Sequence, residues 1–152
     1  MSEEIQKYNS DNVIHSLSIE EQNTLKQIVI EAVKRTDQID IPVDQYIHAG
    51  VYVRTVKIPA GLIACGAFLK VPTSIIISGN CTMSMGDKMV NVVGYKVLKG
   101  EAGRRQVFRA IEDTYITMFF RTDAKTTEEA EMESTDEYRL LTNHRKELLN
   151  SE

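Results

Sequence analysis

The chain has 152 residues, of which 42% are hydrophobic and 26% charged, and its formal net charge is −4. These values are ordinary for a globular protein with one core, and the chain is too short for two full domains. No run of about 18 apolar residues could span a membrane, and the polar, acidic N-terminus does not resemble a secretory signal. Two cysteines, Cys65 and Cys81, form neither a disulfide framework nor a zinc pattern, so we expect reduced, buried thiols in a reducing cytoplasm.

The N-terminal part predicts an amphipathic helix within SLSIEEQNTLKQIVIEAVKRTD. Ser18 and Glu21 have the spacing of a capping box, in which each residue bonds the backbone N–H of the other. Apolar residues then repeat at helical spacing, at Leu25, Ile28, Val29, Ala32 and Val33. The next segment, DQIDIPVDQYIH, contains Pro42 and predicts an extended linker.

The middle of the chain predicts a β-domain, because all eight glycines lie between positions 50 and 103, among β-branched runs. Strands are expected near 52–58, 62–68, 74–78, 81–85, 88–93, 95–98, 105–111 and 114–121. The connecting turns are PAG, SGN, MGDK and KGEAG, since glycine and asparagine supply the positive φ that hairpins need. Eight short strands indicate a closed or two-sheet antiparallel barrel.

The C-terminal part predicts a second helix, opened by a capping box at Thr126 and Glu129. The tail beyond it has Tyr138, Leu141 and Leu148 at helical spacing. We therefore expect a helical arm with linker at 1–49, a β-barrel at 50–122 and an acidic helical arm at 123–152.

Charge is divided in the same way. Residues 1–49 and 123–152 each contain 9 acidic and 4 basic residues, whereas residues 50–122 contain 10 basic and 4 acidic ones. A basic middle between two acidic arms is the main electrostatic feature of the sequence.

The turns and strand order resemble those of a cupin, a family with the motif G-x5-H-x-H-x3–4-E-x6-G followed by G-x5-P-x-G-x2-H-x3-N. Gly61 and Gly79 bound the first motif, and Gly94 and Gly103 match the second. The resemblance covers residues 50–122 and implies a cupin-like antiparallel β-barrel or jelly roll. With the N-terminal amphipathic helix and the C-terminal helical arm predicted above, the expected fold class is mainly β.

The ligand positions of that motif hold residues that do not bind metals. The two histidine positions fall on Ala67 and Leu69, the glutamate position on Thr73 or Pro72, and the last histidine position on Gln106. A catalytic metal needs about three converging His, Cys, Asp or Glu side chains, and no histidine occurs between positions 49 and 143. Sequence analysis therefore predicts no metal, no cofactor and no enzymatic activity; His48, just before the first expected strand, is a candidate rim residue.

Basic residues cluster near the end of the barrel sequence, at Lys96, Lys99, Arg104, Arg105 and Arg109. In RQVFRAI, alternation places Arg105 and Arg109 outward and Gln106, Phe108 and Ala110 in the lumen. The cluster has three interpretations: a solvated face, an interface in which the basic barrel of one subunit meets the acidic arms of another, or an anion site. Nucleic acid is disfavoured because the acidic arms would repel it and aromatic residues are scattered.

The segment after Gly94 also resembles small cupin-like proteins of tailed bacteriophages and prophages. Together with the missing ligand set and the complementary charge blocks, this resemblance indicates a non-enzymatic, homo-oligomeric protein of the host cytoplasm or the virion. Such a protein would act through protein–protein contacts as a virion or accessory component. The alternative is a binding module for an anionic metabolite or nucleotide, for example an anti-defence factor.

Four large side chains are expected in the barrel lumen, where they either fill a small barrel or line a ligand cavity: Phe68, Phe108, Met118 and Phe120.

Overall fold

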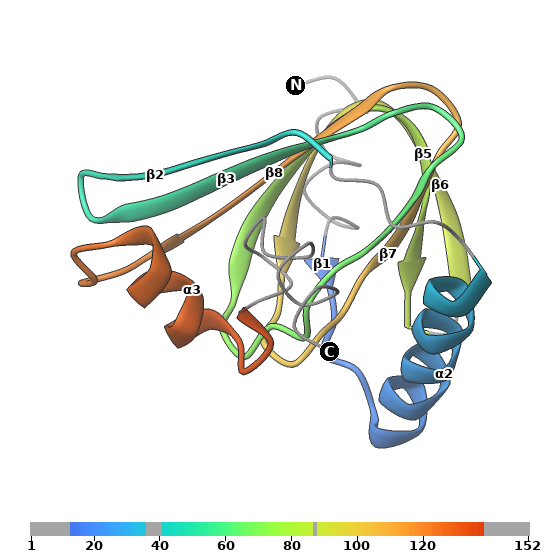
Figure 1. Ribbon diagram of the computed structural model, residues 1–152, viewed down its shortest axis with the longest axis horizontal. Coiled ribbons are helices and arrows are strands. Elements are labelled where there is room, and N and C mark those ends of the chain that lie inside the picture. Colours follow the sequence, from blue (N-terminus) through green and yellow to red (C-terminus); the bar gives the residue numbers. More distant parts are fainter. Residues whose placement is uncertain (1–12, 36–40, 87, 139–152) are drawn as a thin grey trace, which may run out of the picture.

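The computed structural model describes residues 13–35, 41–86 and 88–138, with the side chains of 32–35 excepted, and shows a mainly β architecture with two helices (Figure 1). The elements are β1 (Val13–Ile14), α2 (Ile19–Arg35), β2 (Val43–His48), β3 (Val51–Ile58), β4 (Ile63–Cys65), β5 (Thr73–Met85), β6 (Lys88–Gly100), β7 (Val107–Ala110), β8 (Thr114–Arg121) and α3 (Thr127–Ser134). The predicted fold class, a jelly-roll-like β-domain with a helix on either side in sequence, is confirmed. None of the described helices is long and apolar enough to cross a membrane.

The strands form one strongly folded sheet in the order β1-β6-β5-β8-β3-β2, with β7 pairing both β5 and β4. All pairs are antiparallel except β1 with β6. β5 pairs with β8 up to Ser78 and with β7 from Cys81 onward, so the long β5–β6 hairpin passes from one half of the sheet into the other. The ends of this order, β1 and β2, do not pair within the described part of the chain, so the barrel is an open jelly roll.

The predicted Ser-Gly-Asn turn is wrong, because Gly79 lies in the middle of β5. Gly79 pairs with Gly94 of β6, and both have positive φ, +150° and +85°. A Cβ at Gly79 would lie 2.6 Å from Thr114 Oγ1, so the start of β8 can cross closely at this point. The two glycines therefore bend one long hairpin, formed by β5 and β6, at the top of Figure 1. The sequence had suggested two short hairpins instead.

The N-terminal boundary of the sheet also differs from the prediction. The segment taken as an extended linker contains β2, which pairs with β3 from Val43↔Val56 to His48↔Val51. The tight turn between them uses positive φ at Ala49 (+53°) and Gly50 (+74°). The sheet therefore begins before residue 50.

The main core lies between the two halves of the sheet and is aliphatic, with Ile58, Ile77 and Cys81 fully buried. Alternation in the segment after Arg104 is as predicted: Gln106, Phe108 and Ala110 are buried, and Arg109 is exposed. Val107 has the outward parity of Arg109 but is buried, because it packs with Leu17 and Leu25 beneath α2.

Both helices begin as the sequence predicts. Ser18 Oγ accepts the N–H of Glu21 at 3.1 Å, and Glu21 Oε1 accepts the N–H of Ser18 at 3.0 Å. At α3, the Thr126 side chain accepts the N–H of Glu129 at 3.2 Å. On α2, Leu25 is buried and Val29 is half-buried, whereas Ile28 is 48% exposed, so the apolar stripe is covered only in part. The side chains of Ala32 and Val33, and the tail positions Leu141 and Leu148, lie outside the described residues.

Candidate functional site

The four positions at which the cupin motif places ligands, Ala67, Leu69, Thr73 and Gln106, are all buried. Three of them contact Arg104. The Leu69 N–H donates to the Arg104 carbonyl at 2.8 Å, and the Arg104 guanidinium donates to Gln106 Oε1 at 2.6 Å and to the Thr73 hydroxyl. A buried arginine therefore occupies the part of the interior where this resemblance implies a metal.

Arg104 is a buried cation for which the described residues supply no counter-charge. It is 1% exposed, and burial alone lowers the pKa of its guanidinium to about 10, since no charged neighbour contributes to the shift. Its Nε and the Nε2 of Gln106 have no hydrogen-bond partner in the described structure. Because a buried donor without an acceptor costs about 1 to 3 kcal/mol, this group is held at a cost in folding stability.

The donor set around Arg104 does not fit a metal ion. Methyl, hydroxyl and amide groups replace the imidazoles and carboxylate of the motif, and a guanidinium would repel a second cation at close range. Among residues 13–35, 41–86 and 88–138, no three His, Cys, Asp or Glu side chains converge. His15 and His48 are exposed, as are Glu101, Glu112 and Asp113.

The structure does not bring the five predicted basic residues onto one surface. Arg104, which the sequence grouped with the other four as one basic cluster, is buried. Lys99 is exposed at the end of β6, Lys96 is half-buried on the inward row of Leu98, and Arg109 is exposed on β7 in the other half of the sheet. Arg105 is half-buried in an ion pair.

That ion pair belongs to a set of contacts between the basic barrel and the acidic C-terminal arm of the same chain. Arg105 Nη2 lies 2.7 Å from Glu137 Oε2, and Lys70 Nζ lies 2.8 Å from Asp136 Oδ1. Glu137 Oε1 also accepts the N–H of Phe68 at 3.1 Å. The charge complementarity expected between subunits is thus satisfied in part within one chain. A small cleft of about 250 Å³ adjoins Arg105 and Glu137 beside α2.

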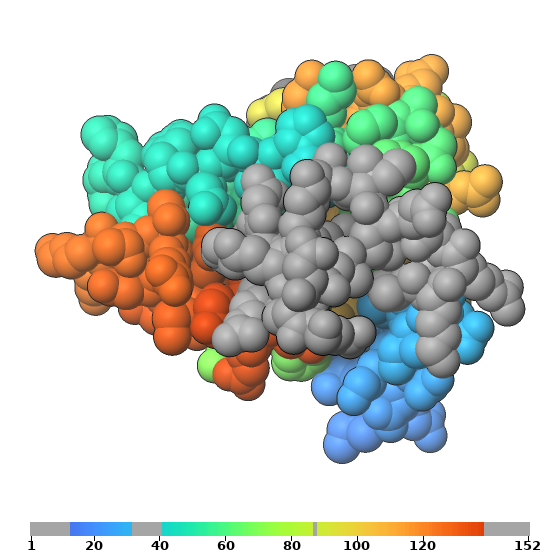
Figure 2. Space-filling view, in the orientation of Figure 1, coloured from blue at the N-terminus to red at the C-terminus, as the bar shows by residue number. Residues whose placement is uncertain are grey.

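A buried polar cluster that the sequence did not reveal attaches α3 to the sheet, where the helix lies against β2 (Figure 2). The Tyr52 hydroxyl donates to Glu131 Oε1 at 2.8 Å, and Arg54 Nη1 donates to Gln45 Oε1 at 3.1 Å. Burial raises the pKa of Tyr52 well above its usual range, with the Glu131 carboxylate adding to the shift. Tyr52 also packs against Phe120 and Ala130, so its ring is enclosed where α3 meets the sheet.

A cleft of about 450 Å³, here called the terminal cleft, opens where β5 begins. The last β5–β8 pair is Ser74↔Phe119, and β8 continues for two residues beyond it, which leaves a notch between the ends of β6 and β8. The residues that line it are Val51, Pro72, Thr73, Ser74, Lys99, Gly100, Glu101, Phe119, Phe120 and Arg121. Lys99 was a candidate from the sequence, whereas Arg121 was not, because only the fold brings the two strand ends together.

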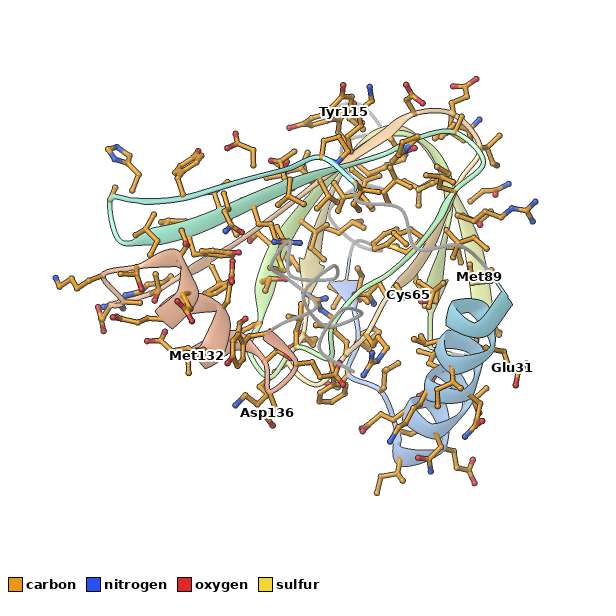
Figure 3. All side chains as sticks on the ribbon, in the orientation of Figure 1. Glu31, Cys65, Met89, Tyr115, Met132 and Asp136 are labelled. Carbon is orange, nitrogen blue, oxygen red and sulfur yellow. The ribbon has the colours of Figure 1, made fainter. Side chains whose placement is uncertain are left out.

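The outer face of the sheet is apolar where β6, β5 and β8 run side by side. Val93, Tyr95 and Val97 of β6 are 60%, 59% and 44% exposed, and Tyr115 of β8 is 48% exposed on the outer surface (Figure 3). Val97 pairs with the half-buried Ile76, and Ser78 lies between Tyr95 and Tyr115. We call Ile76, Val93, Tyr95, Val97 and Tyr115 the outer apolar face.

No protein-family model and no curated protein matches the sequence. Several solved structures with a similar fold are cupin-superfamily proteins. One from Desulfitobacterium hafniense DCB-2 is 12% identical, with 59% of this chain and 84% of that one covered and a TM-score of 0.48. The cupin domain of Schizosaccharomyces pombe Cnp3 is 14% identical (60% and 72%, TM-score 0.47), and a cupin_2 domain of an XRE-family transcriptional regulator from Enterobacter cloacae is 9% identical (52% and 94%, TM-score 0.44). The likeness concerns the fold and not an activity.

Proposed function

We propose that this protein is a non-enzymatic, homo-oligomeric component that acts through protein–protein contacts, and that its outer apolar face packs against the same face of a second copy. The observation that supports this is the exposure of Val93, Tyr95, Val97 and Tyr115 on adjacent strands of one sheet. Contiguous exposed apolar surface of this kind is characteristic of interaction sites in soluble proteins.

A second copy is the occupant that the charges favour. β5 contains no charged residue, and β6 contains lysines but no acidic residue. In a twofold contact the same patch occurs on both sides, so a patch with several like charges at its centre would repel itself, whereas this one would not. A basic partner would need carboxylates here, and neither strand supplies one.

The absence of an enzymatic role is part of the same proposal, and it rests on Arg104 and its neighbours. The interior positions that would hold a reaction centre carry Ala67, Leu69, Thr73 and Gln106, with a guanidinium between them. The buried Tyr52 donates a hydrogen bond from its hydroxyl to Glu131 and packs against Ala130 of α3, so it does not face a cavity in which it could act as an acid.

The test is the solution mass, measured by light scattering after size exclusion at two protein concentrations and at low and moderate salt. We expect a dimer or larger species that persists with salt, because the contact is apolar. Val97→Glu should give a monomer with an unchanged far-UV spectrum. Met132→Glu is the matched control, since Met132 is 49% exposed on α3, far from Tyr115 in Figure 3, and it should leave the mass unchanged. A strict monomer under all conditions would remove the proposal.

The resemblance to phage and prophage proteins gives this proposal its specific form, a virion component or an accessory factor in the host cytoplasm. The genes beside the coding sequence test it: capsid and tail genes would support the virion role, early genes would support an accessory role, and ordinary host metabolic genes would contradict both.

A further inference from the structure

We propose that the terminal cleft binds a small organic anion, a carboxylate or phosphate group carried on an apolar body. This is the alternative of an anionic ligand that the sequence suggested, moved from an exposed basic face to a site formed by Lys99, Arg121 and the buried Arg104. It is independent of self-association.

The rim of the cleft carries two cations from separate strands. Lys99 lies at the end of β6 and Arg121 at the end of β8, with the start of β5 between them. Neither forms an ion pair within the described part of the chain, and Glu101 is the one acidic residue among those that line the cleft. Beyond Phe119, the edge of β8 on the β5 side has no described strand partner, so backbone groups are also available there.

The wall of the cleft lies directly in front of Arg104. Thr73 and Gly100 both line the cleft and both contact the guanidinium: the Thr73 hydroxyl accepts a hydrogen bond from it, and a Cβ on Gly100 would lie 2.2 Å from Nη2. A buried charge is screened far less than a surface charge, so the field of this cation reaches into the cleft. An anion bound there would give Arg104 the counter-charge that the described residues do not supply.

The remaining lining residues are mostly apolar, and this determines the class of ligand. They are Val51, Pro72, Phe119 and Phe120, beside Thr73 and Ser74. The volume of about 450 Å³ falls in the usual range for small-molecule sites. Pockets of this kind take ligands with an apolar body and one or two polar groups, and here the polar group must be anionic.

The experiment uses benzoate and phenyl phosphate as probes and neutral benzamide as their uncharged analogue, with thermal shift and titration calorimetry on the full chain. We expect at least one of the two anions to raise the melting temperature, less so at high salt, and benzamide to have no effect. The anion that binds identifies the group as carboxylate or phosphate. If neither anion binds, or if benzamide stabilises the protein as much as they do, the proposal is wrong.

Variants locate the site. Arg121→Gln should weaken binding of the active probe about tenfold or more, which is the effect of losing one charged hydrogen bond. Arg109→Gln removes the same charge from an exposed arginine on β7 and should leave binding unchanged. Equal losses in the two variants would show a general effect of net charge and would overturn the assignment. The variant Val97→Glu should bind the probe as the parent does, which separates this proposal from self-association.

Discussion

The substitution Gly100→Ala tests the placement of Arg104 most directly. Gly100 does not have the positive φ that favours glycine, so an added methyl group introduces no backbone strain there. The Cβ would lie 2.2, 2.3 and 2.4 Å from Nη2, Nε and Cζ of Arg104, whereas ordinary contacts begin at 3.4 Å. The guanidinium would therefore have to move by about 1 Å, and it is enclosed and held by Gln106 and Thr73.

The expected cost follows from these contacts. Inserting a methyl group into a packed interior costs about 1 to 3 kcal/mol, and losing a hydrogen bond to a charged group costs about 1.5 to 3 kcal/mol. These two costs overlap and do not simply add. Alanine also lowers the conformational entropy of the unfolded chain relative to glycine, which stabilises the folded state by about 0.4 to 1 kcal/mol. We expect Gly100→Ala to lower the free energy of unfolding by about 2 to 4 kcal/mol in urea titrations, with a melting temperature lower by about 5 to 10 °C.

A double-mutant cycle identifies Arg104 as the cause. In an Arg104→Ala background the clash is absent, so Gly100→Ala should then cost less than about 0.5 kcal/mol. Gly94→Ala is the control, because Gly94 has φ +85° and nothing within 4 Å of its Cβ position. It should cost about 1 to 2 kcal/mol through backbone strain, whichever residue is at position 104. If Gly100→Ala costs the same with and without Arg104, or costs nothing, the guanidinium does not lie where the structure places it.

Three further effects are expected. Ser18→Ala should lower the free energy of unfolding by about 1 kcal/mol by removing the helix cap, while Thr24→Ala on the same helix should be near neutral; urea titration compares them. The Ala60 N–H, and next the Lys57 ammonium, lower the pKa of Asp113 below 3.8, so its contribution to stability is present above that pH and is lost as the pH falls through the folded-state value. Asp113→Asn should therefore flatten the acid limb of the stability profile, and an unchanged limb would contradict this. Glu137→Ala removes acceptors for two partners and should speed proteolysis after residue 134 with little change in melting temperature.

The sequence predicted most elements of the fold because their signals are local. Capping boxes, alternation and glycine turns report the conformation of a few adjacent residues, and the caps of α2 and α3 and the β5–β6 turn agree with them. Gly79 was predicted to lie in a turn because glycine is typical both of turns and of bends within a strand. The bend is required by the approach of Thr114, which is distant in sequence. β2 was missed for a similar reason, since its pairing with β3 is a tertiary contact.

The site was predicted only in part. Lys99 was identified, but Arg121 reaches the same cleft through the ends of two strands that local patterns cannot place side by side. Arg104 is different, because a signal for its burial was present. Gln106, Phe108 and Ala110 were expected to point inward, and the same alternation extended two residues toward the N-terminus gives Arg104 the inward parity. Because charged side chains are rarely fully buried, the sequence nevertheless indicated a surface cluster that includes Arg104.

Arg104 links the absence of a metal-binding set to the proposed anion site. A buried guanidinium for which the described residues supply no counter-charge favours negative charge nearby and disfavours a bound cation, so Arg104 acts in the same direction as the non-ligating side chains of Leu69, Thr73 and Gln106. A neutral side chain at position 104 would leave an interior that is merely inert. The arginine makes it electropositive behind a thin wall formed by Thr73 and Gly100, and that wall faces the terminal cleft. In the proposed site the interior of this jelly roll would contribute to binding through the charge of Arg104, while the contacts themselves would be made at the end of the sheet.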